Sequence, residues 1–326
     1  MASAAHSTPP PPLAPPTPAL VGRLVAQART YEAALLRDED AEALHQYRVC
    51  LRQARALLSF MPHGIKPHQR LQLRGELRQL MAPTGALRDL DVLLAQRPSW
   101  ESALPVGLQA PLAPLYPMLA QRRQVLLNDL RQWLASDAYR AQLERLQGGL
   151  REAMTPTVTR DQRQLQRRFG RQLWRCYGRC IRAAGRIDAD SHDAQFHRLR
   201  IQCKKLRYLL HYGSAAHSGR WLDRLQRRLS RLQQHLGAIH DAAMQGAQLR
   251  RLISEPAAAA DAHPPAPPAL PPLCAAAVGA LLLHLERQQH RQRTRVLAAL
   301  DKLAAPRLRR ALRRRLGACT SASAQG

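Results

Sequence analysis

Aromatic residues are scarce in this sequence. They make up 4% of the chain, and only three of them are phenylalanine. Proteins that hold single-stranded nucleic acid usually stack its bases on exposed aromatic side chains, so the scarcity argues against such a surface. Alternating β-branched residues, which predict strands, are also missing, whereas Leu, Ala, Arg and Gln supply most of the sequence and favour helices. We therefore expect an all-α protein.

Long apolar runs and targeting signals are lacking as well. The longest apolar run, LCAAAVGALLL at 273–283, is shorter than the roughly 20 residues that a helix needs to span a bilayer. The first 20 residues have neither the basic start nor the apolar stretch of an export signal, and their prolines prevent a helix. We therefore expect a cytoplasmic protein without a membrane span.

The cysteines do not suggest a metal site or a disulfide framework. There are six, and no two of them form a CxxC pair. Cys176 and Cys180 lie four residues apart, but no His or Cys pair nearby in sequence would complete a metal site. A Gly-rich phosphate loop is also missing. We expect no metal, no cofactor and no enzymatic activity.

Acidic residues are few compared with basic ones. The chain has 23 Asp and Glu against 50 Lys and Arg, which gives a formal net charge of +27. A field of this size attracts polyanions, and the counterions that they release favour binding. The partner is therefore expected to be nucleic acid, an anionic membrane surface or a phosphate polymer.

Proline marks the expected boundaries along the chain. We interpret residues 1–19 as a disordered Pro-rich arm and residues 20–316 as a helical domain. Within that domain, the Pro/Ala-rich stretch 254–272 is expected to form a long surface loop, and residues 317–326 to form a disordered tail.

Two stretches of the sequence repeat each other. LHQYRVCLRQARALL (44–58) aligns without a gap with FHRLRIQCKKLRYLL (196–210), at an offset of 152 residues. GALRD (85–89) and GAIHD (237–241) are related by the same offset, which also aligns the leucines between the motifs, namely Leu73, Leu77 and Leu80 with Leu225, Leu229 and Leu232. A shared offset across separate motifs predicts a duplicated helical unit.

Each repeated helix carries a row of cations beside its apolar face. Positions i, i+3, i+7 and i+10 of a helix fall within an arc of about 80°. The first row, here called the first ridge, consists of His45, Arg48, Arg52 and Arg55. The second ridge consists of His197, Arg200, Lys204 and Arg207, and Lys205 widens it.

Two interpretations of the ridges compete: a solvated helix face and a binding surface. Solvated helices usually mix charges of both signs, but neither ridge contains an acid. Like charges at this spacing repel, so the arrangement costs stability unless an anion offsets it. Its occurrence at matched positions favours binding. Gln53 stands where the second copy has Lys205, which makes the first ridge the weaker one.

His45 and His197 open the two ridges, but the ridges hold no carboxylate or nucleophile that acid–base catalysis would need. Neighbouring cations should disfavour the imidazolium form, and a bound polyanion should favour it. Asp89 and Asp241 end the repeated GALRD and GAIHD motifs. They are expected either to cap a helix or to hold one of the arginines.

Together, HQYRVCLRQARALL with GALRDLDVLL, repeated as HRLRIQCKKLRYLL with GAIHDAA, resemble the CHAD domain family over about residues 20–316. The resemblance implies two four-helix bundles related by pseudo-two-fold symmetry, at about 20–152 and 160–316, with the ridges lining a basic central surface. It further implies binding of inorganic polyphosphate and association with polyphosphate granules. Both ridges would form the site, joined by Arg122 and Arg123 in LAQRRQVLL.

Two alternatives remain beside polyphosphate binding. One is a helical protein associated with nucleic acid through backbone contacts alone. The other is a kinase or phosphatase that acts on polyphosphate, which would need an acidic metal site. The sequence shows no such site, so nucleic-acid association is the stronger alternative.

Overall fold

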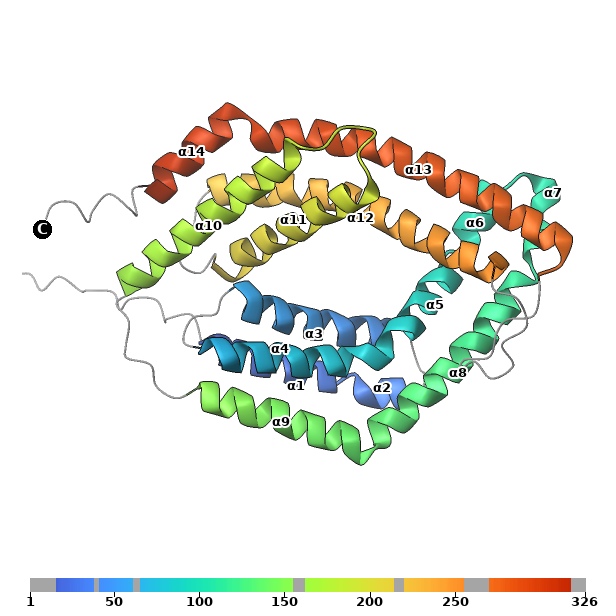
Figure 1. Cartoon of the computed structure of the whole chain (residues 1–326), viewed down its shortest axis with the longest axis horizontal. Coiled ribbons are helices and arrows are strands. Elements are labelled where there is room, and N and C mark those ends of the chain that lie inside the picture. Colours follow the sequence, from blue (N-terminus) through green and yellow to red (C-terminus); the bar gives the residue numbers. More distant parts are fainter. Residues whose placement is uncertain are drawn as a thin grey trace, which may run out of the picture.

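The computed structural model describes residues 16–37, 41–60, 65–154, 162–213, 220–254 and 270–317. All regular secondary structure within these ranges is helical, which confirms the expected all-α class. Figure 1 shows two groups of helices that face each other and are joined at one end. None of the described helices combines the length and the apolar character that crossing a membrane would require.

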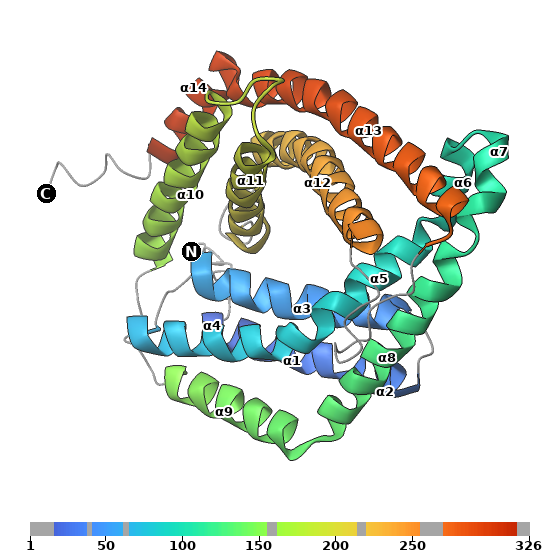
Figure 2. The same ribbon diagram turned by 45° about the vertical axis from the view of Figure 1, so that its right-hand side comes forward.

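The first group of helices comes from the N-terminal part of the chain. Its elements are α1 (Thr17–Arg29), α2 (Glu32–Arg37), α3 (Ala41–Phe60), α4 (Pro67–Met81), η1 (Ala82–Thr84), α5 (Gly85–Ala95), α6 (Arg97–Ala103), α7 (Val106–Gln109), η2 (Ala110–Leu112), α8 (Leu115–Ala135) and α9 (Asp137–Ala153). In Figures 1 and 2, α1, α3, α4 and α9 lie together on one side, and α5 to α8 lead to the end where the two groups meet.

The second group comes from the C-terminal part. Its elements are α10 (Gln162–Ala184), α11 (Asp193–Gly213), α12 (Arg220–Ser254), α13 (Pro272–Ala304) and α14 (Pro306–Gly317). α12 and α13 are 35 and 33 residues long, so each extends about 50 Å at 1.5 Å per residue. This length carries both helices from their own group to the joined end (Figure 2).

Proline sets several helix starts. Pro18 and Pro272 lie in the first turns of α1 and α13, where the missing N–H of proline leaves no helical bond unmade. For this reason α1 already begins at Thr17, inside the segment predicted as the disordered arm, and α13 begins at the last residue of the predicted loop 254–272. The rest of the predicted arm up to residue 15, loop residues 255–269 and tail residues 318–326 lie outside the described residues.

The described apolar side chains gather into three clusters, whereas the family resemblance implied two bundles. The first core joins α1, α3, α4, α8 and α9, and the second joins α10 to α14. The third core lies at the joined end and takes side chains from α5, α6, α8, α12 and α13. It therefore connects the N-terminal and C-terminal parts through buried apolar surface, the main favourable contribution to folding.

The aligned leucines of the repeat are buried as its period predicts. Leu73, Leu77 and Leu80 in α4 and their counterparts Leu225, Leu229 and Leu232 in α12 are at most 1% exposed. The two copies nevertheless differ, because α4, η1 and α5 align with the single helix α12. Pro83 lies in η1 where the second copy has His235. Proline has no N–H to donate to a helical bond, and the chain forms a 3₁₀ turn there.

Candidate anion-binding site

The first ridge lies along α3, at the edge of the face that packs into the first core. Residues on that face are at most 2% exposed, namely Leu44, Tyr47, Leu51, Ala54 and Leu58. His45, Arg48 and Arg55 are partly buried, and Arg52 is exposed. The apolar face thus fixes the helix, and the cations stand beside it at the protein surface.

The 3₁₀ turn η1 holds Arg48 in place. Nη1 of Arg48 donates to Oγ1 of Thr84 at 2.5 Å and lies 3.4 Å from the carbonyl oxygen of Met81. Thr84 is fully buried and donates its hydroxyl proton to the same carbonyl at 2.7 Å. A hydroxyl that donates once can still accept, so Thr84 orients the guanidinium group of Arg48.

Each ridge has one carboxylate beside it. Asp89 lies near Arg48, and Asp241 lies near Arg200. Partial loss of hydration raises the pKa of both carboxyl groups, and the neighbouring cations oppose this rise. Asp89 is the fifth residue of α5, and Asp241 lies well inside α12, so neither residue caps a helix. Of the two roles considered from sequence, their positions favour holding the arginines.

The second ridge lies along α11 and meets a histidine from α12. Burial and the charge of Arg200 lower the pKa of Lys204 to about 8. The ring of His240 lies 5.2 Å from that of His197, measured between centroids. Burial, followed by the charges of Arg200 and His197, lowers the pKa of His240 to about 4. At neutral pH, Lys204 is therefore mostly charged and His240 is neutral.

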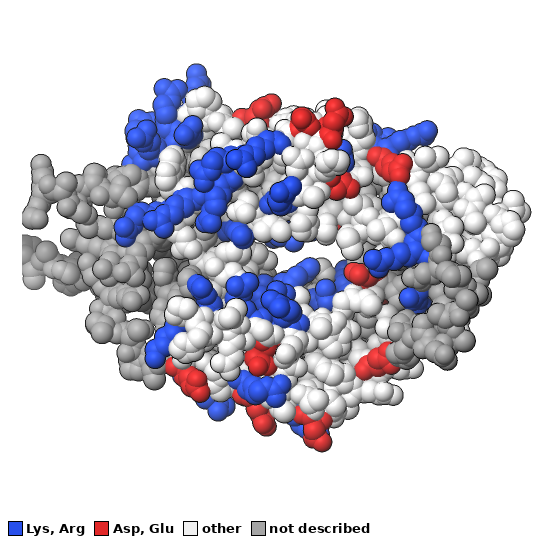
Figure 3. All heavy atoms as spheres, in the orientation of Figure 1, with Lys and Arg blue, Asp and Glu red and all other residues white. Residues whose placement is uncertain are grey.

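The two ridges belong to one charged surface. Loss of hydration is the main reason that the pKa values of Arg200 and Lys204 are lowered, and the charge of Arg52 from the other group of helices lowers both further. Cations from α3 and α11 therefore lie close enough to repel one another. Figure 3 shows Lys and Arg along both sides of the hollow between the two groups of helices.

Aromatic contacts join α3 to α11. The ring of Phe60, the last residue of α3, stacks on Tyr208 with 6.3 Å between centroids and 18° between planes. Nζ of Lys205 lies 5.7 Å from the centre of the Phe60 ring, within the range of a cation–π contact. The side-chain amide of Gln172 on α10 donates to the carbonyl of Phe60. These contacts fix the two ridges relative to each other at this end.

The ends of the ridges have different surroundings. Arg55 faces α4, where the nearby charges of Arg78 and Arg74 add to the effect of burial in lowering its pKa. The basic surface of the first ridge therefore continues onto α4. In the second ridge, Arg207 is exposed, and its guanidinium group lies 5.8 Å from the centre of the Tyr208 ring.

Arg123, which the resemblance places in the site, forms an ion pair with a buried carboxylate of α5. Its Nε donates to Oδ1 of Asp91 at 2.7 Å, and the side chain of Asp91 is only 1% exposed. Asp91 follows Asp89 by two residues on α5, which turns its side chain about 200° around the helix. The ion pair therefore lies on the side of α5 away from Arg48. Arg122 precedes Arg123 on α8, outside both ridge helices.

Two residues at the site were not predicted from sequence. After burial, the charge of Arg88 is the largest influence that lowers the pKa of His45, and His240 contacts His197. Arg88 and His240 occupy the same position in GALRD and GAIHD, directly before Asp89 and Asp241. The repeat therefore contained the signal that would have identified them.

The site offers an anion many hydrogen-bond donors and much positive charge. Guanidinium groups present planar pairs of N–H donors that match phosphate oxygens, and an ammonium group adds a compact charge. Among the described residues, no group of three or more His, Cys, Asp or Glu side chains is arranged to hold a metal ion.

Comparison with known proteins identifies the family. The CHAD domain family matches residues 19–250. The fold is similar to that of the CHAD domain from the plant Ricinus communis, with 23% identity and a TM-score of 0.67 over 89% of this chain and 92% of that one. PptA from Streptomyces chartreusis is 20% identical, with a TM-score of 0.51 over 87% of this chain and 99% of that one. No curated protein matches significantly. Because the family match covers well over half of the sequence, the chain belongs to the CHAD domain family.

Proposed function

We propose that this protein binds inorganic polyphosphate along the hollow between the two ridges, without catalysing its turnover. The observation that carries the proposal is the mutual repulsion of cations from the two ridges, Arg52 on one side and Arg200 and Lys204 on the other. A single anionic chain that lies between them contacts both. Association with polyphosphate granules in the cytoplasm follows from such binding.

The electrostatics of the ridges favour a polymer of phosphates. Loss of hydration and neighbouring like charges lower the pKa values of Lys204 and the ridge arginines. Keeping these groups charged therefore costs free energy in the protein without a bound anion. Polyphosphate carries negative charge at every repeat and presents oxygens that match guanidinium donors. Binding therefore replaces repulsion between the ridges by attraction.

The aromatic residues near the ridges favour polyphosphate over nucleic acid. Phe60 and Tyr208 stack on each other, and Lys205 covers the Phe60 ring. These rings are already engaged within the protein, whereas binding of single strands relies on rings that are free to stack with bases. Inorganic polyphosphate has no bases and needs only the cations.

We also propose that the chain arose by internal duplication, with two helical bundles related by a pseudo-two-fold axis. The support lies in matched environments at the shared offset. Arg48 has Asp89 beside it, and Arg200 has Asp241 beside it. The third core then lies where the two copies join.

Removing ridge charges tests the proposed function. Replacing Arg52, Arg200 and Lys204 with Gln should weaken polyphosphate binding about a hundredfold or more, because hydrogen bonds to charged groups contribute about 1.5–3 kcal/mol each. Arg48 is kept, because its bond to Thr84 supports η1. Helical circular dichroism should be unchanged, and the melting temperature should be equal or higher because repulsion is relieved.

A charge-matched control uses Arg23, Arg151 and Arg287, which are exposed on α1, α9 and α13. Changing these three to Gln removes the same total charge and should preserve affinity within a few-fold. Equal losses in both variants would mean that only net charge matters.

A competition experiment distinguishes polyphosphate from nucleic acid. Polyphosphate should displace labelled DNA from the protein, whereas DNA at the same concentration should not displace labelled polyphosphate. The opposite result would favour nucleic acid as the partner.

A further inference from the structure

A second basic hollow lies between α10 and α14, away from the ridges. It has a volume of about 640 Å³, which lies within the range of roughly 300–1,000 Å³ that small-molecule sites occupy. Neither helix contains an acidic residue. α14 lies beyond residues 19–250, the part of the chain that matches the family. The hollow is therefore built partly from sequence outside that match.

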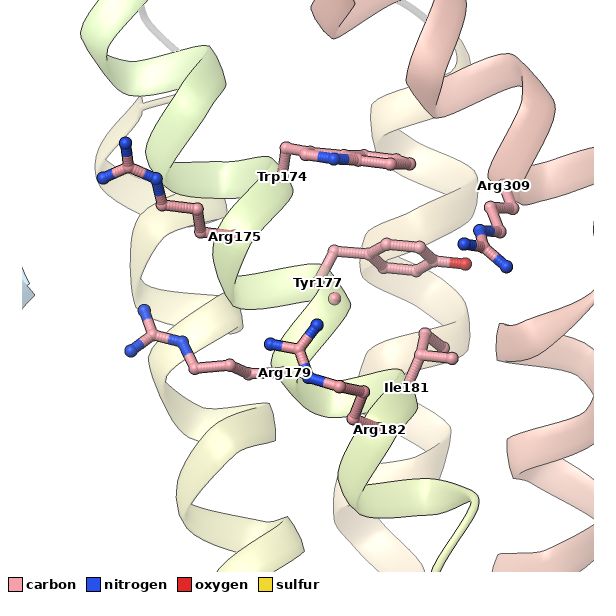
Figure 4. Close-up of a pocket in the computed structure, with 8 residues that line it drawn as sticks. Trp174, Arg175, Tyr177, Arg179, Ile181, Arg182 and Arg309 are labelled. Carbon is pink, nitrogen blue, oxygen red and sulfur yellow. The ribbon is translucent and has the colours of Figure 1, made fainter.

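Four arginines line this hollow. Arg175, Arg179 and Arg182 follow one another on α10 at helical spacing, and Arg309 comes from α14. All four are exposed. Figure 4 shows Arg175 and Arg179 along one side of α10, and Arg309 reaching in from the neighbouring helix on the other. Since none of the described residues that line the hollow is acidic, its arginines favour an anion.

An aromatic pair adds a feature that an inorganic anion does not need. The rings of Trp174 and Tyr177 stack with 5.9 Å between centroids and 29° between planes. Tyr177 is 2% exposed, and its hydroxyl donates to the carbonyl of Leu303 at 2.9 Å. Tyr177 is thereby fixed and supports Trp174, whose indole remains partly exposed at the hollow. Figure 4 shows both rings pointing from α10 towards the helix that carries Arg309.

The floor of the hollow is open because it contains a glycine. Gly178 lies inside the 23-residue helix α10, although glycine is the poorest helix former after proline. A Cβ added there would meet Nη1 of Arg182 at 3.5 Å, which is an ordinary contact with the end of a flexible side chain. Alanine therefore fits at this position, whereas a larger side chain would fill the floor.

We infer that the α10–α14 hollow binds a nucleotide, with its phosphates among the guanidinium groups and its base against the indole of Trp174. Arginine and an aromatic face together are the combination that proteins use for phosphate and base. One partly exposed indole suits a single nucleotide, since a nucleic-acid strand would need a row of stacking rings. This site is separate from the ridges and does not depend on the proposed function.

Tryptophan fluorescence tests the inference, with ATP and inorganic tripolyphosphate as probes. The full chain with Arg52, Arg200 and Lys204 changed to Gln serves as the background, so that the ridges contribute little binding. ATP should quench the fluorescence and bind about tenfold or more tightly than tripolyphosphate, because base stacking adds to phosphate binding. Trp174→Phe should remove the quenching. Trp133→Phe, whose indole packs on Tyr139 in the other group of helices, should retain it.

Variants of Gly178 and Arg309 test whether the ligand lies in this hollow. Gly178→Leu should abolish ATP binding with helicity kept, since leucine is a better helix former, and Gly178→Ala should bind as before. Arg309→Gln should weaken binding about tenfold, and Arg310→Gln on the same helix should not. Equal affinity for ATP and tripolyphosphate would overturn nucleotide recognition. Quenching that survives Trp174→Phe or Gly178→Leu, or no ATP binding at all, would overturn the site.

Discussion

Lys204 differs from the arginines around it because its charge depends on pH near neutrality. Burial and the charge of Arg200 lower its pKa to about 8, whereas arginine stays protonated throughout. A bound polyphosphate favours the ammonium form, so the pKa of Lys204 is higher in the complex than in the free protein. The contribution of Lys204 to affinity should therefore be constant below pH 7, and affinity should fall as the pH rises from 7 to 9.

Replacing Lys204 with Arg should flatten this fall, because the charge is then retained up to pH 9. Isothermal titration calorimetry with long-chain polyphosphate at pH 7, 8 and 9 measures the difference between the two proteins. Parallel curves for the wild-type protein and the Lys204→Arg variant would show that Lys204 does not contact the anion.

His240 should take up a proton when polyphosphate binds. Burial and the charges of Arg200 and His197 hold its pKa at about 4 in the free protein. A bound anion reverses the local field and raises that pKa, so affinity should increase as the pH falls from 6.5 towards 4. His240→Asn should remove most of this increase. NMR titration of the imidazole with and without polyphosphate measures the shift; the same pKa in both states would leave His240 a packing residue only.

At the scale of elements, the 3₁₀ turn η1 is expected to set the geometry of the first ridge. Thr84→Val keeps the volume but removes the oxygen that accepts from Arg48. Affinity for polyphosphate should fall about three- to tenfold. The free energy of unfolding should fall by about 1–2 kcal/mol, because the hydroxyl group of Thr84 takes part in two hydrogen bonds that usually contribute about 1 kcal/mol each. Calorimetry and urea denaturation measure the two effects.

Thr294→Val provides the control, because Thr294 is exposed on α13. It should leave both affinity and stability nearly unchanged. If Thr84→Val lowers stability but not affinity, the orientation of Arg48 is irrelevant to binding, and its charge alone matters.

The elements also show what sequence could and could not predict. Both ridges and their buried leucines follow from helical periodicity and a constant offset, which are local properties of the chain. The pairing of Arg123 with Asp91 spans 32 residues and depends on how α5 packs against α8. The stacking of Phe60 on Tyr208 likewise joins two distant helices. No local pattern encodes either contact.

At the scale of the whole molecule, polyphosphate binding should depend steeply on salt. If about seven ridge cations contact phosphates, log affinity should fall with log salt at a slope of about −5, by analogy with single-stranded polyanions. Changing Arg52, Arg200 and Lys204 to Gln should reduce the slope by about 2. Titrations between 50 and 300 mM salt give both values; a flat response would mean that the ligand is not held by ion pairing.

The sequence does not predict which helices pack together at the joined end of the molecule, although it predicts the ridges. The repeat implies that each half packs against itself, and the first and second cores agree with this. The third core draws Trp100 from α6 and Leu281 from α13, which lie far apart in sequence and outside the repeated motifs. Apolar faces are visible in a sequence, but their partners are decided by the packing of whole helices.

The third core has a consequence for how the chain folds during synthesis. Buried residues of the first core come from positions 21 to 153, so that core is complete once α9 has left the ribosome. The third core waits for α12 and α13, because Leu249 and Leu281 are part of it. Until then Trp100 and Leu115 lack their core partners from α12 and α13, and apolar surface that is exposed in a partly folded chain promotes aggregation. A chain truncated after α9 would therefore complete the first core but lack the α12 and α13 side chains that cover this apolar surface.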